Sequence, residues 1–595
     1  MLQGLGATGL GLIASGPAAA KQARGNGDGN PGKGTESAGS PSTDPTIKRR
    51  VNDERKTRRD YSRAQLVKDA DASPHASNDR VSERAVVAKF GKSLPHDGET
   101  GLPTTDAYGT LVDACESGSG YESIPQASQN VDTEVRPLVQ PESAWTYQTS
   151  GGSTAQLRIA RPPAFDDPET GAEMIELYWR ALTRDVGFYD YGSSDLVAAA
   201  AAELDSLDAY NGPGSDGTVT PGNVFRGVVP GAETGPYVSQ FLWKDRALGG
   251  GVEDQKIEVQ ATGSDYATTV DEWLAIQRGV PPGKRNLPPN EFGETRYILT
   301  GRDMCERVHD DPPFRQLQKA AQVLIFTMNA PLDDNLPYTL KPFSDGQNDQ
   351  RNKETFLGQT TLPFNDFGPL YVEKKVLGAS EQGQLAAWHK KWNVHRRLRP
   401  EEYGGRVQAV KGEEGEISEP DGVSYPIPTN LLDSDALSRT KETFGSYLLP
   451  QAYAEGSPTH PSYPAGHSVV AGAGVTVLKA LFDGDYEFPA GEKVVPTRDG
   501  QELLTAEETS DLGVDETLTV RGELNKLASN MALGRNRAGI HYRTDGIEGL
   551  RLGEAAAIRY LEDQLSLPVR TREYGDLSLS LTTFDGESVT IRPSA

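Results

Sequence analysis

Apolar residues recur at helical spacing in several separate stretches of the chain. In the stretch 169–185, one helical face collects Met174, Leu177, Tyr178 and Leu182. The same periodicity predicts helices over residues 194–209, 268–278 and 313–329. Alternation of apolar and polar residues is confined to the acidic insertion 483–520 and to residues 573–593, where Asp585-Gly586 is typical of a hairpin turn. The pattern therefore predicts an all-α core with minor β-hairpins.

Composition divides the chain into five predicted parts. They are an uncharged Gly/Ala-rich leader (1–20), a low-complexity linker with a loosely attached helix (21–90), an N-terminal helical part (91–385), a second helical bundle (386–570) and a hairpin tail (571–595). The leader ends in small residues before Lys21 and resembles the apolar region of a twin-arginine signal whose arginines would precede Met1. Export is therefore expected. A disordered leader on a cytoplasmic protein is the alternative.

Charge and composition narrow the classes of partner. The 595 residues carry a formal charge of −25, and such an acidic surface repels nucleic-acid phosphate. Dense carboxylates favour a protein adapted to high salt, and an ordinary solvated acidic surface is the alternative. No run of 18 apolar residues follows the leader, so no membrane span is expected. Cys115 and Cys305 belong to no C-x-x-C pair, which leaves one disulfide or two buried thiols.

Histidines and basic residues cluster in one part of the chain. The sequence has no P-loop, no H-E-x-x-H and no G-x-S-x-G motif, which argues against the commonest NTPases, zincins and serine hydrolases. Five of the eight histidines lie between positions 389 and 541, beside groups of Arg and Lys. In an acidic protein, this concentration of cations indicates an anion site.

The first candidate segment is KWNVHRRLRP. If this segment is helical, Lys391 and Arg399 project from one face, and Pro400 ends the helix near the site. A solvated basic face of a helix is the alternative interpretation. Taken alone, the segment does not decide between the two.

The second segment is HPSYPAGH, which runs from His460 to His467 and precedes an apolar helix. The first turn of that helix is expected around Pro464, where unpaired N–H groups and the helix dipole favour a bound anion. Gly466 allows the backbone to approach an oxyanion, and His467 is placed to exchange a proton with it. A proline-flanked turn capped by a core histidine is the alternative.

The third segment, RNRAGIHYRTD, contains Arg535, His541 and Asp545. The carboxylate of Asp545 can reach His541 Nδ1–H and orient the ring, leaving Nε2 free to attack or ligate. Alone this is a weak motif, because His/Asp pairs are common on helix faces. Together the three segments supply a lysine, two arginines, a backbone donor and two histidines, which suit a tetrahedral oxyanion.

The order K-x7-R-P, P-[small]-G-H and R-x5-H-x3-D resembles the vanadium-dependent haloperoxidases, which share their helical core and anion site with type 2 phosphatidic acid phosphatases. KWNVHRRLRPEEYGG and SPTHPSYPAGH are similar to the bromoperoxidase branch from red algae. The resemblance covers about residues 145–565. It implies two helix bundles with the site at the end of the second, and a homo-oligomer.

The resemblance also implies roles for individual residues. His541 would be the sole protein ligand of vanadium, through Nε2, with Asp545 behind it. The groups implied to hold the vanadate oxygens are Lys391, Arg399, Arg535 and the Gly466 N–H. His467 would be the acid–base group, Lys391 would polarise the peroxide, and His460 matches the second pocket histidine of the branch. The implied reaction oxidises halide, with bromide expected, by hydrogen peroxide to hypohalous acid, which then reaches an organic acceptor.

One position departs from the family pattern. The family usually has a serine hydroxyl donating to vanadate at the position of Ala465, so the cofactor is expected to bind more weakly by about 1.5–3 kcal/mol. The family also binds calcium upstream of the lysine segment. The matching region here holds Gln359, Asn365, Asp366 and Phe367, with a spacing that assigns no ligand.

Two other functions fit the same residues. A soluble acid phosphatase would use His541 as the nucleophile on phosphorus and His467 to protonate the leaving group. A non-catalytic oxyanion-binding relative is the third hypothesis, with Ala465 as a sign of decay.

Overall fold

The structure is a computed structural model of the chain. It describes residues 86–127, 135–146, 150–151, 157–214, 218–248, 250–284, 287–309, 312–337, 363–413, 416–505, 508, 517–566 and 577–593. The chain divides into two units, Met1–Glu54 and Arg55–Ala595, and every described residue belongs to the second. The predicted leader, and nearly all of the predicted linker and attached helix, lie outside the described residues. The five-part division of the chain stays a prediction.

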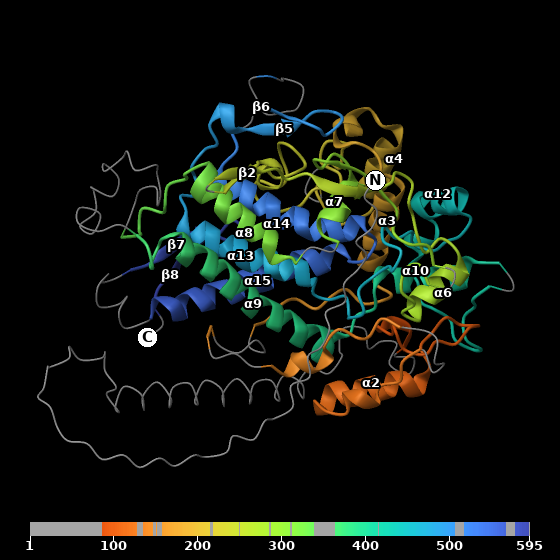
Figure 1. Cartoon of the computed structure of the whole chain (residues 1–595). Coiled ribbons are helices and arrows are strands. Elements are labelled where there is room, and N and C mark those ends of the chain that lie inside the picture. Colours follow the sequence, from red (N-terminus) through yellow and green to blue (C-terminus); the bar gives the residue numbers. More distant parts are fainter. Residues whose placement is uncertain are drawn as a thin grey trace, which may run out of the picture. The chain divides into compact units, whose positions relative to one another are not determined.

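Long helices form the centre of the described part. They are α9 (Pro369–His389), α13 (Gly466–Leu481), α14 (Val520–Arg537) and α15 (Arg543–Leu565). α13 is buried along almost its whole length and packs against the other three, while α8 (Phe314–Gln322) packs beside α9 (Figure 1). Small residues allow the close approach, because a Cβ on Gly472 would lie only 2.3 Å from the Leu550 carbonyl oxygen of α15.

The remaining helices surround this centre. They are α2 (Thr105–Ser117), α3 (Pro168–Leu182), α4 (Asp195–Asp205), α5 (Gln240–Trp243), α6 (Val270–Gln277), α7 (Gly301–Arg307), α10 (Pro400–Lys411), α11 (Thr429–Leu432) and α12 (Asp435–Phe444). The four helices predicted from periodicity correspond to α3, α4, α6 and α8. The last of them continues as a π-helical turn, Val323–Thr327, beyond α8. The prediction of a helical core is confirmed.

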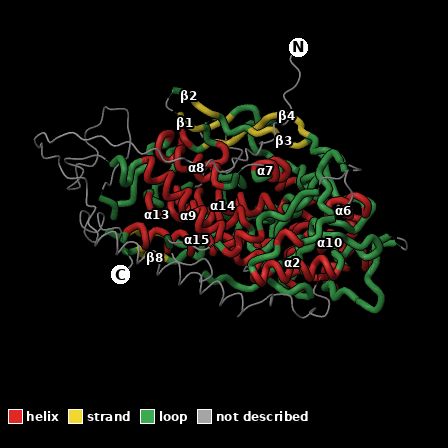
Figure 2. Tube along the Cα trace, turned by 60° about the horizontal axis from the view of Figure 1, so that its bottom comes forward, coloured by secondary structure: helices red, strands yellow, loops and turns green. Residues whose placement is uncertain are grey.

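The described strands pair two by two in short antiparallel sheets at the periphery of the helices (Figure 2). The pairs are β1 (Arg246–Leu248) with β2 (Gly251–Glu253), β3 (Ile257–Gln260) with β4 (Phe292–Arg296), β5 (Val494–Pro496) with β6 (Leu503–Thr505), and β7 (Leu579–Thr582) with β8 (Ser588–Ile591). β5 and β6 lie in the predicted acidic insertion, but β1 to β4 lie outside both regions where strands were expected, so the confinement of β-structure to the insertion and the tail is wrong. β7 and β8 flank the predicted Asp585-Gly586 turn, where Gly586 has a φ of 83°.

The sulfur-containing side chains of the described residues are all buried. They are Met174, Met304, Met328, Met531, Cys115 and Cys305, and none is more than 3% exposed. Both cysteines are free thiols, so the disulfide alternative is wrong. No helix in the described part of the chain is long and apolar enough to cross a bilayer.

Candidate active site

The ends of several helices bring the predicted site residues together. Lys391 follows α9, Arg399 precedes α10, His460 and Gly466 flank the start of α13, and Arg535 and His541 lie around the turn between α14 and α15. Seven of the eight predicted residues are at least nine-tenths buried, and His467 is partly buried. The neighbouring contacts described below link these segments into one site.

The first segment is not the single helix that the sequence suggested. α9 ends at His389, a π-helical turn covers Lys390–His395, and Arg396 then takes a left-handed conformation with φ 46°. Pro400 begins α10 rather than ending a helix, because proline fits the first helical position without losing a hydrogen bond. Lys391 and Arg399 therefore reach the site from two elements, not from one helical face.

Three buried cations of the site bond to neutral groups. Lys391 Nζ donates to the carbonyl oxygens of Pro461 (2.7 Å) and Ser462 (2.8 Å). Arg535 donates to the Val308 carbonyl oxygen at 2.5 Å. Within the described residues, neither of these cations nor Arg399 has a carboxylate within ion-pairing distance. We call Lys391, Arg399 and Arg535 the cage cations.

Arg399 links two of the site histidines. Its guanidinium donates to the His460 carbonyl oxygen (2.9 Å) and lies 3.0 Å from His460 Nδ1. It also lies 2.9 Å from His541 Nε2. An anion held at Nε2 would replace this last contact with N–H···O bonds, which are stronger when the acceptor is charged.

Asp545 orients His541 as the spacing predicted. The His541 Nδ1 and Asp545 Oδ2 atoms are 2.8 Å apart, which fits an Nδ1–H that donates to the carboxylate and leaves a lone pair on Nε2. The pair does not share a helix, since His541 lies in the turn before α15 and Asp545 is in the first turn of α15. The Tyr542 N–H also donates to Asp545 (3.1 Å).

The start of α13 offers backbone donors in a space bordered by Gln384 and Trp388. α13 begins at Gly466, with Ala465 as its N-cap. A Cβ on Gly466 would be in ordinary van der Waals contact with Gln384 and Trp388, both at 3.5 Å, so these two side chains lie against the glycine. Ala465 is fully buried, and no side-chain cap bond is present at this end of the helix. The position has backbone donors but no side-chain hydroxyl.

Two further histidines border this space. No described group bonds His467 Nε2, although that atom is buried. The ring of His460 packs against Trp388, with 4.9 Å between ring centroids. These positions leave His467 available for a proton and His460 beside an apolar wall.

Burial controls the protonation of the site. Burial, together with the cage cations, holds the pKa values of His541, His467 and His460 well below the usual histidine range. Burial and Arg399 lower the pKa of Lys391, and burial and Arg535 lower that of Arg399. The charged forms of these groups therefore lack a counter-charge in the site, and a bound anion would supply it and raise their pKa values again.

The structure adds contacts that the motifs did not reveal. Arg397 donates to Asp545 Oδ1 at 2.9 Å, and the Ser462 hydroxyl donates to Asp545 Oδ2. Glu173 of α3 holds the other side of Arg397 at 3.1 Å. Arg397 and Ser462 lie within the quoted motifs, where their polar side chains were a usable signal. No sequence signal pointed to Glu173, because its partners are far away in the sequence.

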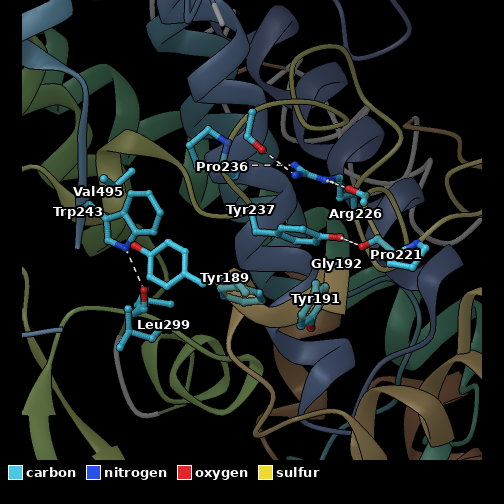
Figure 3. A pocket seen from close by; sticks show the side chains of 14 residues that line it. Tyr189, Tyr191, Gly192, Pro221, Arg226, Pro236, Tyr237, Trp243, Leu299 and Val495 are labelled. Carbon is cyan, nitrogen blue, oxygen red and sulfur yellow. Dashed lines mark hydrogen bonds between the residues drawn. The ribbon is translucent and has the colours of Figure 1, made fainter. Parts of the chain in front are cut away.

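The pockets differ in their relation to the site. Arg535 lines an open pocket of about 760 Å³ together with His309, Tyr453 and Glu455, so this pocket reaches one of the three cage cations. Figure 3 shows a separate aromatic cavity of about 240 Å³ whose walls include Tyr237 and Trp243. The lining of this second cavity includes none of the predicted site residues.

The calcium prediction gains no support from the geometry. Among the described residues, no group of three or more His, Cys, Asp or Glu side chains could hold a metal ion. Gln359 lies outside the described residues, and Asn365, Asp366 and Phe367 lie just before α9. Calcium stays a prediction.

A buried cluster of cations with a carboxylate-oriented histidine, at the ends of packed helices, defines an oxyanion-binding site of a helical-bundle enzyme. Residues 378–564 match the family described as the VCPO second helical-bundle domain. The chain is 35% identical over 505 residues to a vanadium-dependent bromoperoxidase from Ascophyllum nodosum, covering 81% of this chain and 83% of the relative. It is 30% identical to one from Corallina officinalis, covering 85% and 91%.

A solved structure is also similar. The homohexameric second vanadate-dependent bromoperoxidase of Ascophyllum nodosum matches with a TM-score of 0.77 and 27% identity, over 95% of this chain and 94% of that one. The chain belongs to the vanadium-dependent bromoperoxidase family. The family resemblance and the fold expected from the sequence are confirmed. The roles of the individual site residues stay predictions.

Proposed function

We propose that the protein is a vanadate-dependent haloperoxidase that uses hydrogen peroxide to oxidise halide, with bromide expected, to hypohalous acid. The observation that carries this proposal is the set of three buried cage cations beside a histidine oriented by Asp545. The three have no carboxylate partner in the described part of the chain. Membership of the bromoperoxidase family supports the cofactor and the halide.

The residues present fit vanadate. His541 Nε2 would ligate vanadium, and Lys391, Arg399, Arg535 and the Gly466 N–H would hold the oxygens. Bound vanadate supplies a Lewis acid that activates hydrogen peroxide toward attack by halide. The cage cations are fixed by backbone carbonyls, so they stabilise an oxyanion without reorganising during the reaction.

His467 is the candidate acid–base group. Its Nε2 bonds to no described group, and burial together with Arg535 and Lys391 lowers the pKa of its ring, so the ring is neutral before the anion binds. A bound anion raises that pKa again by placing negative charge beside the ring. His467 then takes a proton from peroxide and returns it to the leaving oxygen. His460, against Trp388, would border the halide's approach.

The direct test is halogenation of a reporter diketone with peroxide and bromide, with and without added vanadate. We expect halogenation that depends on both vanadate and bromide. Vanadate-independent activity, or none with vanadate bound, would contradict the proposal. Chloride in place of bromide, and the reporter in place of another organic acceptor, then define the substrate range.

A soluble acid phosphatase is the second candidate, because the cage cations and His541 suit phosphate as well as vanadate. Hydrolysis of a phosphate ester by the same preparation tests it. Ala465, buried and without a hydroxyl, favours the third candidate, a non-catalytic oxyanion-binding relative. Anion binding without either activity would support that candidate.

We also propose that the chain forms a homo-oligomer, since a similar bromoperoxidase is homohexameric. Light scattering measures the assembly directly. The charge of −25 supports adaptation to high salt, which a rise in unfolding temperature from dilute buffer to molar potassium chloride would bear out. Export through a twin-arginine-like leader is tested by the N-terminal sequence of the native protein, and an end near Met1 favours the cytoplasm.

A further inference from the structure

Two buried glutamates of α3 face the turn that carries the proposed vanadium ligand. Glu173 and Glu176 are 2% and 1% exposed, and they lie about one helical turn apart. Both accept hydrogen bonds from residues at the start of α15. Glu173 accepts from the Thr544 N–H at 2.6 Å, and Glu176 accepts from Arg543 Nε at 2.8 Å. Two carboxylates of the N-terminal half of the chain thus contact the start of α15.

Only one of the two glutamates connects to Asp545. Arg397 lies between Glu173 and Asp545. One of its guanidinium nitrogens is 3.1 Å from Glu173 Oε2, and another is 2.9 Å from Asp545 Oδ1. The guanidinium also stacks 3.8 Å above the Tyr542 ring, which fixes its plane. The other Asp545 oxygen accepts from His541 Nδ1. An unbroken chain of contacts therefore runs from Glu173 through Arg397 and Asp545 to His541.

We propose that Glu173 is a positioning residue for the vanadate site, which sets the donor strength of His541 by sharing the Arg397 guanidinium with Asp545. This inference rests on the proposed function of His541 as the vanadium ligand. Glu173 touches neither the ligand nor the cage cations, so it acts only through Arg397 and Asp545.

The direction of the effect follows from charge. Burial raises the pKa of Glu173 to about 7, so this carboxyl carries its full charge only above that pH, where the variants are compared. There, ionised Glu173 takes part of the positive charge of Arg397, which leaves more negative charge on Asp545 for the His541 Nδ1–H. A stronger acceptor at Nδ1 makes Nε2 the stronger donor toward a metal. Without the Glu173 charge, Asp545 is the one carboxylate left to pair with Arg397. Asp545 then accepts less strongly from His541 Nδ1–H, and Nε2 becomes a weaker ligand.

Glu176 provides the matched control. It lies on the same helix, is equally buried and binds two arginines, Arg180 (2.8 Å) and Arg543 (2.8 Å). It makes no contact with Arg397 or Asp545 among the described residues. A loss of charge at Glu176 therefore costs packing and pairing without reaching His541.

The experiment compares Glu173→Gln and Glu176→Gln in the full chain. Vanadate affinity is measured by equilibrium dialysis, and the vanadium-51 NMR shift of the bound ion reports the donor strength of its ligand. We expect Glu173→Gln to weaken vanadate binding by about 10–100-fold and to move the shift, as is usual for loss of an outer partner of a metal ligand. Glu176→Gln should match the wild type in both readouts.

Equal affinity and shift for Glu173→Gln and wild type would overturn the proposal, as would the same change in both variants. If Glu173→Gln does not fold, Glu173→Asp is used, because its side chain is one methylene shorter and places the carboxylate farther from Arg397. It should lower the vanadate affinity by a smaller factor in the same direction. An unchanged affinity would overturn the proposal. Wild-type chain that binds vanadate without halogenating contradicts the proposed function and leaves this comparison intact. Wild-type chain that binds no vanadate overturns both.

Discussion

The buried cations around residues 541–545 fall into two groups that differ in their partners. Arg397 and Arg543 pair with the carboxylates of Asp545, Glu173 and Glu176. The cage cations Lys391, Arg399 and Arg535 are as deeply buried, yet their partners are carbonyl oxygens and neutral histidines.

The pKa directions of the two groups are opposite. Although burial opposes it, the carboxylates raise the pKa values of Arg397 and Arg543. Burial and the neighbouring cations lower those of Lys391 and Arg399. The difference shows that burial alone does not distinguish a structural arginine from a ligand-binding one. The missing counter-charge does, and that charge is what an oxyanion would supply.

The largest effect is expected from His541→Ala. The cage cations attract an anion, but the proposed bond to vanadium is made by the Nε2 of His541, which Asp545 orients, so vanadate binding should be abolished. Equilibrium dialysis measures it. Retention of vanadate at wild-type affinity would mean that the unpaired charge is sufficient and that His541 is not the ligand.

His467→Ala should separate binding from turnover. The cage cations and His541 remain, so vanadate should still bind, while loss of the proton-transfer group lowers the halogenation rate by about 10²–10⁴-fold. Dialysis and initial rates are measured on one preparation. Should this variant lose vanadate as completely as His541→Ala, the separate roles of the two histidines would have to be abandoned.

Removing one cation from each group should change stability in different ways. Arg397→Met leaves the buried carboxylates of Glu173 and Asp545 unpaired and should destabilise the anion-free protein by about 3–5 kcal/mol. Lys391→Met removes a buried charge that has no counter-charge and should be neutral or stabilising. Urea unfolding in phosphate-free buffer checks both variants. Equal destabilisation would break the distinction between the groups.

Ala465→Ser should strengthen the site by a smaller amount. A serine hydroxyl before the first turn of α13 adds one hydrogen bond to a charged oxygen, worth about 1.5–3 kcal/mol or roughly ten- to a hundredfold in vanadate affinity. Vanadate titration measures it, with Ala465→Gly as the control that adds no donor. An unchanged affinity for the serine variant would indicate that the site was not shaped for this anion.

The smallest effect is expected at His309, which, like Arg397 and Arg543, pairs with carboxylates. His309 lies between Glu306 (3.0 Å) and Glu455 (2.7 Å), and although burial opposes it, these carboxylates raise the pKa of His309 to about 9. Its stabilisation is fully present below the ordinary pKa near 6.5 and is lost as pH rises through 9. The unfolding temperature should therefore fall between pH 6 and 10, and fall less in His309→Gln. Parallel pH profiles of the two proteins would contradict this.

Local patterns predicted much of the fold and failed where two structures fit one pattern. The periodicity that predicts α3, α4, α6 and α8 is a property of each helix's own buried face. The π-helical turn at Lys390–His395 has no such signature, because its residues are also compatible with an ordinary helix. Pro400 likewise ends one helix or begins another, and only the packing of α10 decides between them.

The contacts of the candidate site are likewise of two kinds, those that spacing in the sequence predicts and those that depend on packing. His541 and Asp545 lie four residues apart, so their contact could be predicted from spacing. Glu173 is 224 residues from Arg397 and 371 from Thr544, so its contribution depends on how α3 packs against α15 and has no trace in the local sequence. Motifs therefore identified the groups that would touch an anion, and Asp545 behind His541, but missed Glu173.

The burial of sulfur bears on how long such a catalyst would last. A haloperoxidase meets its own oxidant before any other molecule does, and thioethers and thiols are among the side chains most readily oxidised. Only five methionines and two cysteines occur in the chain, and the six of these seven residues that the structure describes are at most 3% exposed. With its sulfur atoms enclosed, the described part of the protein presents few of its most readily oxidised groups to hypohalous acid, so each molecule should complete more catalytic cycles before oxidative damage stops it.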